Sequence, residues 1–224
     1  MGLWADAVAV AAKDLRIEAH SRVGVGHVVP FALVLLMVFA FAFGPDSSAL
    51  PGAAPGLYWV SVLFSAMLGA QRSFAIEAED AAGEGMILAG LDPAGIVLGK
   101  AAALAVQLLA LEALLAGGIA ILYNVQLRSL AVLAGSALVA TAGIACTSTL
   151  YAALSSGSSA KESMLPLLSL PVLAPVVLAA TKAWSYGLAG HPSFSGPWLE
   201  LLGLFTIVYV SLGAAVAGPL LEVS

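Results

Sequence analysis

The sequence predicts an all-α, polytopic membrane protein with six transmembrane helices, preceded by an amphipathic helix at the membrane surface. Hydrophobic residues make up 61% of the 224 residues and charged residues only 9%, whereas soluble domains are about half apolar. The mean hydropathy is +1.04. Six apolar runs also come close to, or exceed, the roughly 20 residues that a helix needs to cross a bilayer.

Residues 1–24 are predicted to form the surface helix. Their apolar residues recur at steps of three and four, with the charges mostly between them: Trp4, Ala7, Val8, Ala11, Leu15 and Ala19. This spacing is typical of a helix that lies in the membrane interface, although a solvated leader is the alternative. The charged residues also interrupt the apolar core that a cleavable signal peptide needs.

The six spans are predicted from the apolar runs near 28–43, 57–74, 95–123, 127–154, 164–183 and 197–221. Pro30 is expected in the opening turn of the first span, where proline is tolerated. The fourth span is rich in small residues, with Ser136 four residues before Ala140 and Gly143 four before Thr147. Small residues at this spacing let helices approach closely in lipid. We therefore expect the fourth span to be central in the bundle.

The basic residues predict the orientation. With the N-terminus in the cytoplasm, six of the eight lie on the cytoplasmic side: Lys13, Arg16, Arg22, Arg72, Lys100 and Lys161. Only Arg128 and Lys182 then lie outside, as the positive-inside rule requires. The aromatic residues at the opposite ends are predicted to form an interfacial belt: Tyr58, Trp59, Tyr123, Trp184, Tyr186 and Trp198. Both termini are therefore expected in the cytoplasm.

An acidic segment, residues 75–95, joins the second and third spans on the cytoplasmic side. It holds five of the chain's thirteen acids: Glu77, Glu79, Asp80, Glu84 and Asp92. An ionised group in hydrocarbon costs several kcal/mol, so the segment must lie in water or against another protein. Its apolar residues would form the anchor of a docking surface that the acids surround: Met86, Ile87, Leu88 and Leu91, followed by Pro93.

Several function classes are excluded by what the sequence lacks. The net charge of −5 and the scattered basic residues argue against nucleic-acid binding. Cys146 is the only cysteine, so neither an internal disulfide nor a cysteine metal cluster is expected. The chain has no P-loop, zinc-peptidase motif or nucleophile elbow. We expect a non-catalytic protein with no resident metal or cofactor. If it transports a substrate uphill, the energy must come from a partner or an ion gradient.

The fifth span contains three prolines, Pro166, Pro171 and Pro175. Each lacks an N–H group and crowds the preceding turn, so the helix is expected to kink. The kink is either a hinge for a conformational cycle or a feature that neighbouring helices accommodate.

Glu112 is the one carboxylate well inside a span, five residues after Gln107. A buried intramembrane acid marks a candidate polar path. The alternative is a hydrogen-bonded side chain that faces a polar neighbour within the bundle. A proton-coupled secondary transporter that uses Glu112 is therefore a hypothesis to test.

The cytoplasmic segment resembles that of six-span ABC exporter permeases. The resemblance rests on Phe74, the acids that follow it, a glycine at Gly83 or Gly85, and Gly99-Lys100. More closely, K-D-L-R-I-E at 13–18 and L-P-L-L-S-L-P-V-L-A-P-V-V-L-A-A-T at 165–181 resemble the haem exporter protein B family, CcmB. The resemblance extends over essentially the whole chain.

This resemblance implies that residues 1–224 form one ABC exporter-type transmembrane domain in a bacterial cytoplasmic (inner) membrane. It further implies a separate ATPase subunit that binds ATP and docks on residues 75–95, a haem-handling membrane protein of the cytochrome c maturation system, and pairing with a second permease or a second copy. Haem would be the transported or handled ligand. A non-transporting assembly scaffold is the remaining alternative.

Overall fold

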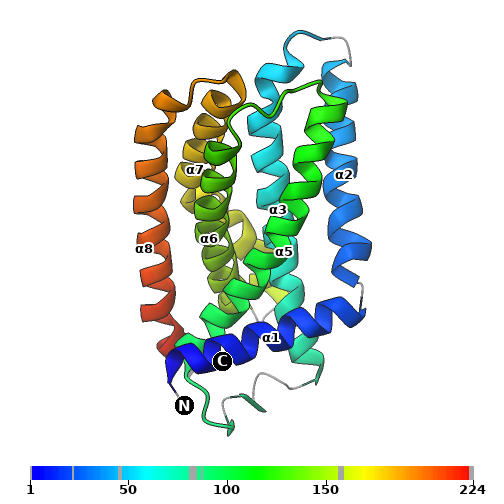
Figure 1. Ribbon diagram of the computed structural model, residues 1–224. Helices are drawn as coiled ribbons and strands as arrows, with labels where there is room; N and C mark the ends of the chain where they lie inside the picture. Colours follow the sequence, from blue (N-terminus) through cyan, green and yellow to red (C-terminus); the bar gives the residue numbers. More distant parts are fainter. Residues whose placement is uncertain are drawn as a thin grey trace.

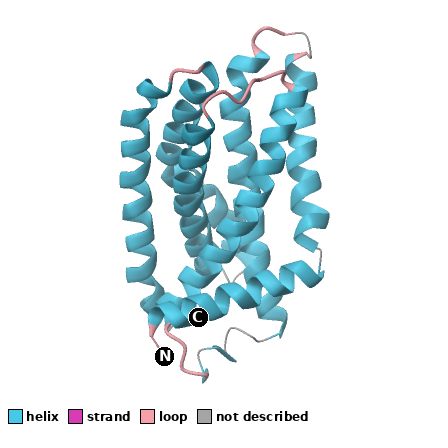
Figure 2. Cartoon of the chain, viewed as in Figure 1, coloured by secondary structure: helices cyan, strands magenta, loops and turns pink. Residues whose placement is uncertain are grey.

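Helices form nearly all of the computed structural model, which describes residues 2–21, 23–44, 47–80, 85–86, 88–155 and 159–221. The described residues contain no β-strand (Figure 2). The elements are α1 (Leu3–Ser21), α2 (Val23–Phe43), α3 (Leu50–Asp80), α5 (Pro93–Leu122), α6 (Leu130–Ser155), α7 (Ser159–Ala189), the 3₁₀ helix η1 (Pro192–Ser195) and α8 (Gly196–Leu221). The predicted all-α class is confirmed.

Within the described ranges, six helices are long and apolar enough to cross a membrane: α2, α3, α5, α6, α7 and α8. They stand side by side, while α1 lies across one end of the bundle (Figure 1). Both chain ends lie at that same end of the molecule (Figure 1). On α1, Trp4 and Val8 are exposed while Ala7 and Val10 are buried. The helix is thus apolar on two sides, one facing the bundle and one facing outward.

Several helices are longer than the apolar runs suggest. α2 begins at Val23, so Pro30 lies inside the helix and not in its opening turn. α3 begins at Leu50 and continues to Asp80, beyond both predicted ends of the second span. The predicted boundaries followed hydropathy, whereas the backbone stays helical through the glycines, prolines and charged residues that flank the apolar core. Membrane helices accept such prolines because neighbouring groups satisfy the freed carbonyls.

α6 is the central helix, as its small residues predict. It contacts α3, α5, α7 and α8. Ser136, Ala140 and Thr147 are buried. A Cβ placed on Gly143 would lie 2.8 Å from Thr206 Oγ1 of α8. The small residues therefore allow the close helix contacts expected in lipid.

The predicted aromatic belt is wrong for four of its six members. Tyr58, Trp59 and Trp184 are buried inside the bundle, where the rings of Tyr58 and Trp184 stack at 3.9 Å. Tyr123 is also buried and donates a hydrogen bond to the Leu36 carbonyl at 3.0 Å. Position along a span does not determine which side of the helix a residue occupies, and here these rings pack between helices instead of facing the interface.

Candidate coupling site and its brace

The segment that joins α3 to α5 starts on a helix. α3 continues six residues beyond Phe74, so Glu77, Glu79 and Asp80 belong to its last turns and not to a loop. Their side chains lie outside the described part of the chain, as do residues 81–84 and 87, which include Glu84 and Ile87. The docking role of these acids therefore stays a prediction.

The second half of the segment is a compact turn. The Leu91 amide donates to the Met86 carbonyl at 3.2 Å, and Gly90 has a φ of +76°, which glycine adopts without strain. Leu88 is 87% exposed, whereas Leu91 and Pro93 are half-buried. Met86 contacts α1, with Lys13 Nζ 3.8 Å from its Sδ. Of the predicted apolar anchor, Leu88 is the described residue that is fully available to a partner.

Two aspartates fix the junction between this segment and α5. Asp92 is the N-cap of α5, where its Oδ1 accepts a 2.8 Å hydrogen bond from the Ala94 amide, and Pro93 follows at the position that favours proline. The Asp92 amide in turn donates to Asp6 Oδ2 of α1 at 3.1 Å. Asp6 is buried. The end of the segment is thus bonded directly to α1.

α1 rests on the backbone of α5 through Gly95 and Gly99. A Cβ on Gly95 would lie 3.0 Å from the Leu3 carbonyl oxygen, and one on Gly99 would lie 2.6 Å from that of Ala7. The two glycines are four residues apart and so share one face of α5. At Gly99 a Cβ would force the helices apart, and at Gly95 it would be tightly packed. The sequence carries the signal as a small-xxx-small pair, but the prediction did not use it.

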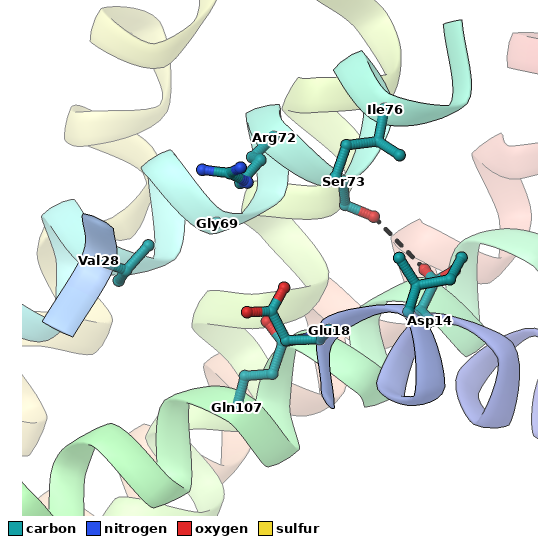
Figure 3. Close-up of a pocket in the computed structure, with 9 residues that line it drawn as sticks. Asp14, Glu18, Val28, Gly69, Arg72, Ser73, Ile76 and Gln107 are labelled. Carbon is teal, nitrogen blue, oxygen red and sulfur yellow. Dashed lines mark hydrogen bonds between the residues drawn. The ribbon is translucent and has the colours of Figure 1, made fainter. Parts of the chain in front are cut away.

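A buried lysine joins three helices beside this contact. Lys100 of α5 has a side chain 1% exposed and lies 3.2 Å from Asp14 Oδ2 of α1. Its ammonium also donates to Ser73 Oγ of α3 at 3.0 Å and lies 4.8 Å from the centre of the Phe74 ring. Ser73 donates to the same Asp14 oxygen (Figure 3). We call these four residues the Lys100 network. From sequence, Lys100 was predicted as a flanking cytoplasmic charge and as part of the Gly99-Lys100 pair that carries the resemblance, and not as a buried ion-pair partner.

A cavity lies next to the Lys100 network, between α1, α2, α3 and α5. Its outer part, about 50 Å³, is lined by Asp14, Ile17, Glu18, Val28, Gly69, Arg72, Ser73, Ile76 and Gln107 (Figure 3). An adjoining part of about 230 Å³ shares Glu18, Val28, Gly69 and Gln107 and is otherwise mainly apolar. The structure places Gln107 in the wall of both parts.

Glu112 lies elsewhere, packed between helices. It is 3% exposed and its Oε1 accepts a hydrogen bond from Thr141 of α6. Its Oε2 is buried with no hydrogen-bond partner in the described part of the chain. Gln107 and Glu112 thus face different surroundings, and Glu112 is not among the residues that line the cavity. Its role in proton coupling stays a prediction.

The prolines of α7 lie in an uninterrupted helix. Next to Pro171, the Val172 carbonyl accepts a hydrogen bond from the Tyr209 hydroxyl of α8, which joins α7 to α8 at this level. The side chain of Pro166 lies outside the described residues. The hinge role of Pro166, Pro171 and Pro175 stays a prediction.

No metal site is present in the described ranges, where no three His, Cys, Asp or Glu side chains could hold an ion together. Cys146 is buried and free, and its thiol lies 3.6 Å from the Tyr209 carbonyl oxygen. A small buried cysteine in a helix contact serves as a packing residue.

Comparison with known proteins gives matches along nearly the full chain. The model of the CcmB protein family matches residues 5–224. Heme exporter protein B of Paracoccus denitrificans is 30% identical over 213 residues, which cover 93% of this chain and 96% of that protein. The proteins of the same name from Pseudomonas aeruginosa and Haemophilus influenzae are 28% and 26% identical, covering 93% and 95% of both chains, respectively. The family-model match over this length, together with six candidate spans among the described residues, identifies the chain as a member of the CcmB family.

Proposed function

We propose that this chain is the membrane permease subunit of an ABC-type complex for haem export or haem delivery in c-type cytochrome biogenesis. The family match supports it, because relatives that cover nearly the same length are named heme exporter protein B. The chain contains no P-loop, so ATP binding and hydrolysis belong to a separate ATPase subunit. The permease itself is non-catalytic, and haem is its cargo.

Residues 75–95 couple the permease to that ATPase in this proposal. The observation that carries it is the bonding of this segment to the spans. Asp92 is bonded to Asp6 of α1, and α1 packs on the α5 backbone at Gly99. The Lys100 network then joins α1, α3 and α5. A push on the exposed Leu88 would thus move three helices as one unit, which is the rigid element that a power stroke requires.

The proposed setting is a bacterial cytoplasmic membrane, with α1 on its cytoplasmic surface and with residues 75–95 and both termini in the cytoplasm. Residues 1–224 form a single ABC exporter-type transmembrane domain that pairs with a second copy or another permease. A haem-handling membrane protein associates alongside. The subunit either conducts haem or uses ATP turnover in the partner to release a haem-loaded carrier.

The test is co-purification of the tagged permease with its ATPase from membranes. Replacing Glu77, Glu79 and Asp80 together with Ala removes the acids of the last turns of α3. We expect weaker recovery of the ATPase and unchanged membrane insertion. Glu200→Ala, an exposed acid on α8 near the opposite end, is the matched control. Full recovery of the ATPase by the triple variant would overturn the docking role of these acids.

The two alternatives predict different results. A proton-coupled secondary transporter would move its substrate as the purified chain alone in proteoliposomes. A non-transporting scaffold would support cytochrome c maturation even when the partner ATPase carries an inactivating P-loop substitution. The proposed permease does neither.

A further inference from the structure

The cavity between α1, α2, α3 and α5 has the polarity of a binding site for an amphiphile. Its outer part holds the polar side chains of Glu18, Arg72 and Gln107. Its larger part follows α5 away from Gln107, past Leu108 and Leu111 to Leu114. Residues 107 to 114 rise about 10 Å along a helix. A polar head at one end and a hydrocarbon chain at the other would match this gradient.

The cavity faces the region where lipid would lie. Leu114 lines its apolar part and is 45% exposed. The span in α2, which supplies Val28 and Val29 to the wall, is only 17% buried in the described bundle. The polar end lies beside α1, the helix that crosses the end of the bundle (Figures 1 and 3). A membrane lipid could therefore enter sideways and keep its headgroup at the level of α1.

At the polar end, one acid and one base each have a buried atom without a hydrogen-bond partner among the described residues. Glu18 Oε1 and Arg72 Nε are buried, and neither has a hydrogen-bond partner in the described part of the chain. Figure 3 shows the Glu18 carboxylate extending from α1 toward α3, which carries Arg72. Most buried polar side-chain atoms in native proteins have a hydrogen-bond partner, so a ligand or a water is expected at each of these two atoms.

The other acid at this end is already neutralised. Asp14 forms ion pairs with Lys100 at 3.2 Å and with Lys13 at 3.0 Å. The remaining charges on the described lining residues are the carboxylate of Glu18 and the guanidinium of Arg72. Their sum is zero. A ligand that pairs with both charges therefore presents a cation to Glu18 and an anion to Arg72 and adds no net charge to the cavity.

We propose that this cavity binds a phospholipid with a zwitterionic, primary-ammonium headgroup, phosphatidylethanolamine. The ammonium pairs with Glu18 and the phosphate with Arg72, both as charge-assisted hydrogen bonds. The Gln107 amide donates to a phosphate or ester oxygen. One acyl chain lies along Leu108, Leu111 and Leu114.

The same chemistry disfavours other amphiphiles. Phosphatidylcholine has no N–H to donate to Glu18, and the anion of phosphatidylglycerol has no cation to offset that carboxylate. A porphyrin with two propionates would meet one guanidinium and an uncompensated acid. The described lining residues include no His, Cys or Met that could ligate its iron. The proposed lipid site does not depend on the proposed coupling to an ATPase.

Native mass spectrometry of the full chain in detergent tests this site. Dioleoyl phosphatidylethanolamine, phosphatidylcholine and phosphatidylglycerol are offered in equal amounts. We expect a preference for phosphatidylethanolamine of at least about fivefold, the order of one charge-assisted hydrogen bond. Equal adducts of all three lipids on the unmodified protein would overturn the proposal, whatever the variants do.

Three variants locate the site. Glu18→Gln keeps the side-chain shape and should reduce phosphatidylethanolamine binding to the level of phosphatidylcholine. Arg72→Gln should weaken the binding of all three lipids. Ala110→Phe should block the apolar part of the cavity without altering a charge. Arg128→Gln, an exposed arginine whose guanidinium bonds Gln126 near the other end, is the matched control. A preference that survives Glu18→Gln would overturn the assignment.

Haemin serves as a competitor in the same experiment. We expect it to leave the lipid adduct unchanged. Displacement of the lipid by haemin in an Arg72-dependent, Glu18-independent manner would identify a porphyrin site and overturn the proposal.

Discussion

Lys100 of α5 and Asp14 of α1 form an ion pair, 3.2 Å from Nζ to Oδ2, with side chains 1% and 10% exposed. The attraction within an ion pair this buried offsets the free-energy cost of desolvation only when further hydrogen bonds satisfy both groups. Ser73 supplies two, since its hydroxyl accepts a hydrogen bond from Lys100 and donates one to Asp14. The pair therefore holds the surface helix to two spans.

Lys100→Met should release α1 from the bundle. The substitution leaves the Asp14 carboxylate at a helix contact without its buried partner, and breaking such a pair costs about 3 kcal/mol or more. We expect a lower midpoint of thermal unfolding in detergent and faster proteolysis within residues 3–21. Adding Asp14→Asn should recover part of the loss. Lys182→Met removes an exposed lysine and should change neither measurement.

Gly99→Ala should displace α1 by steric contact alone. The new Cβ would lie 2.6 Å from the Ala7 carbonyl oxygen and 2.8 Å from Val10 Cβ, closer than such atoms pack. Overpacking of this kind typically costs about 1–3 kcal/mol.

Amide hydrogen exchange over residues 3–21 measures this effect, with a rise of roughly tenfold or more expected. Gly117→Ala is the control on the same helix, because a Cβ there has nothing within 4 Å. Equal exchange in both variants would show that the close approach of α1 to α5 does not hold α1 in place.

Leu88→Asp should weaken docking of the ATPase. Leu88 is 87% exposed, so the substitution removes an apolar contact for a partner without leaving a cavity in the permease. Truncated anchor residues cost roughly 1–2 kcal/mol of binding, about tenfold in affinity. Pull-down of the purified ATPase on permease in nanodiscs measures it. The control is Leu130→Asp, because Leu130 is also exposed but lies at the opposite end of the bundle. This variant should bind the ATPase normally.

The number and type of the helices could be predicted from sequence because hydropathy, span length and small-residue spacing are local signals. α6 is an example, since its run of small side chains identified it as central before any contact was known. The end of α3 could not be predicted in the same way. Hydropathy falls after Phe74, although the helix continues to Asp80.

The Lys100 network depends on contacts that one segment cannot reveal. Asp14 and Lys100 are 86 residues apart in sequence, and each alone looks like a solvated charge at a membrane boundary. The Gly95 and Gly99 pair can be found in the sequence. It lies at the start of a span, where glycine is common, so the pair alone does not indicate a helix contact. The predicted aromatic belt was wrong for a related reason. Tyr58 and Trp184 contact each other only when α3 and α7 pack together.

Glu112→Gln separates the permease from the proton-coupled transporter. The amide keeps an oxygen that can accept the hydrogen bond from Thr141 and places its NH₂ where Oε2 has no partner in the described structure. A packing residue should tolerate this change, whereas a proton carrier cannot function without its carboxyl group.

We therefore expect Glu112→Gln to retain ATPase binding and cytochrome c maturation at the level of the unmodified protein. Glu112→Leu is the structural comparison, because it leaves the buried Thr141 hydroxyl without its acceptor and should cost about 1–3 kcal/mol of stability. Maturation lost in Glu112→Gln while its thermal midpoint and ATPase binding are unchanged would contradict the packing role. It would instead assign proton coupling to Glu112, because the two side chains differ mainly in the ability to release a proton.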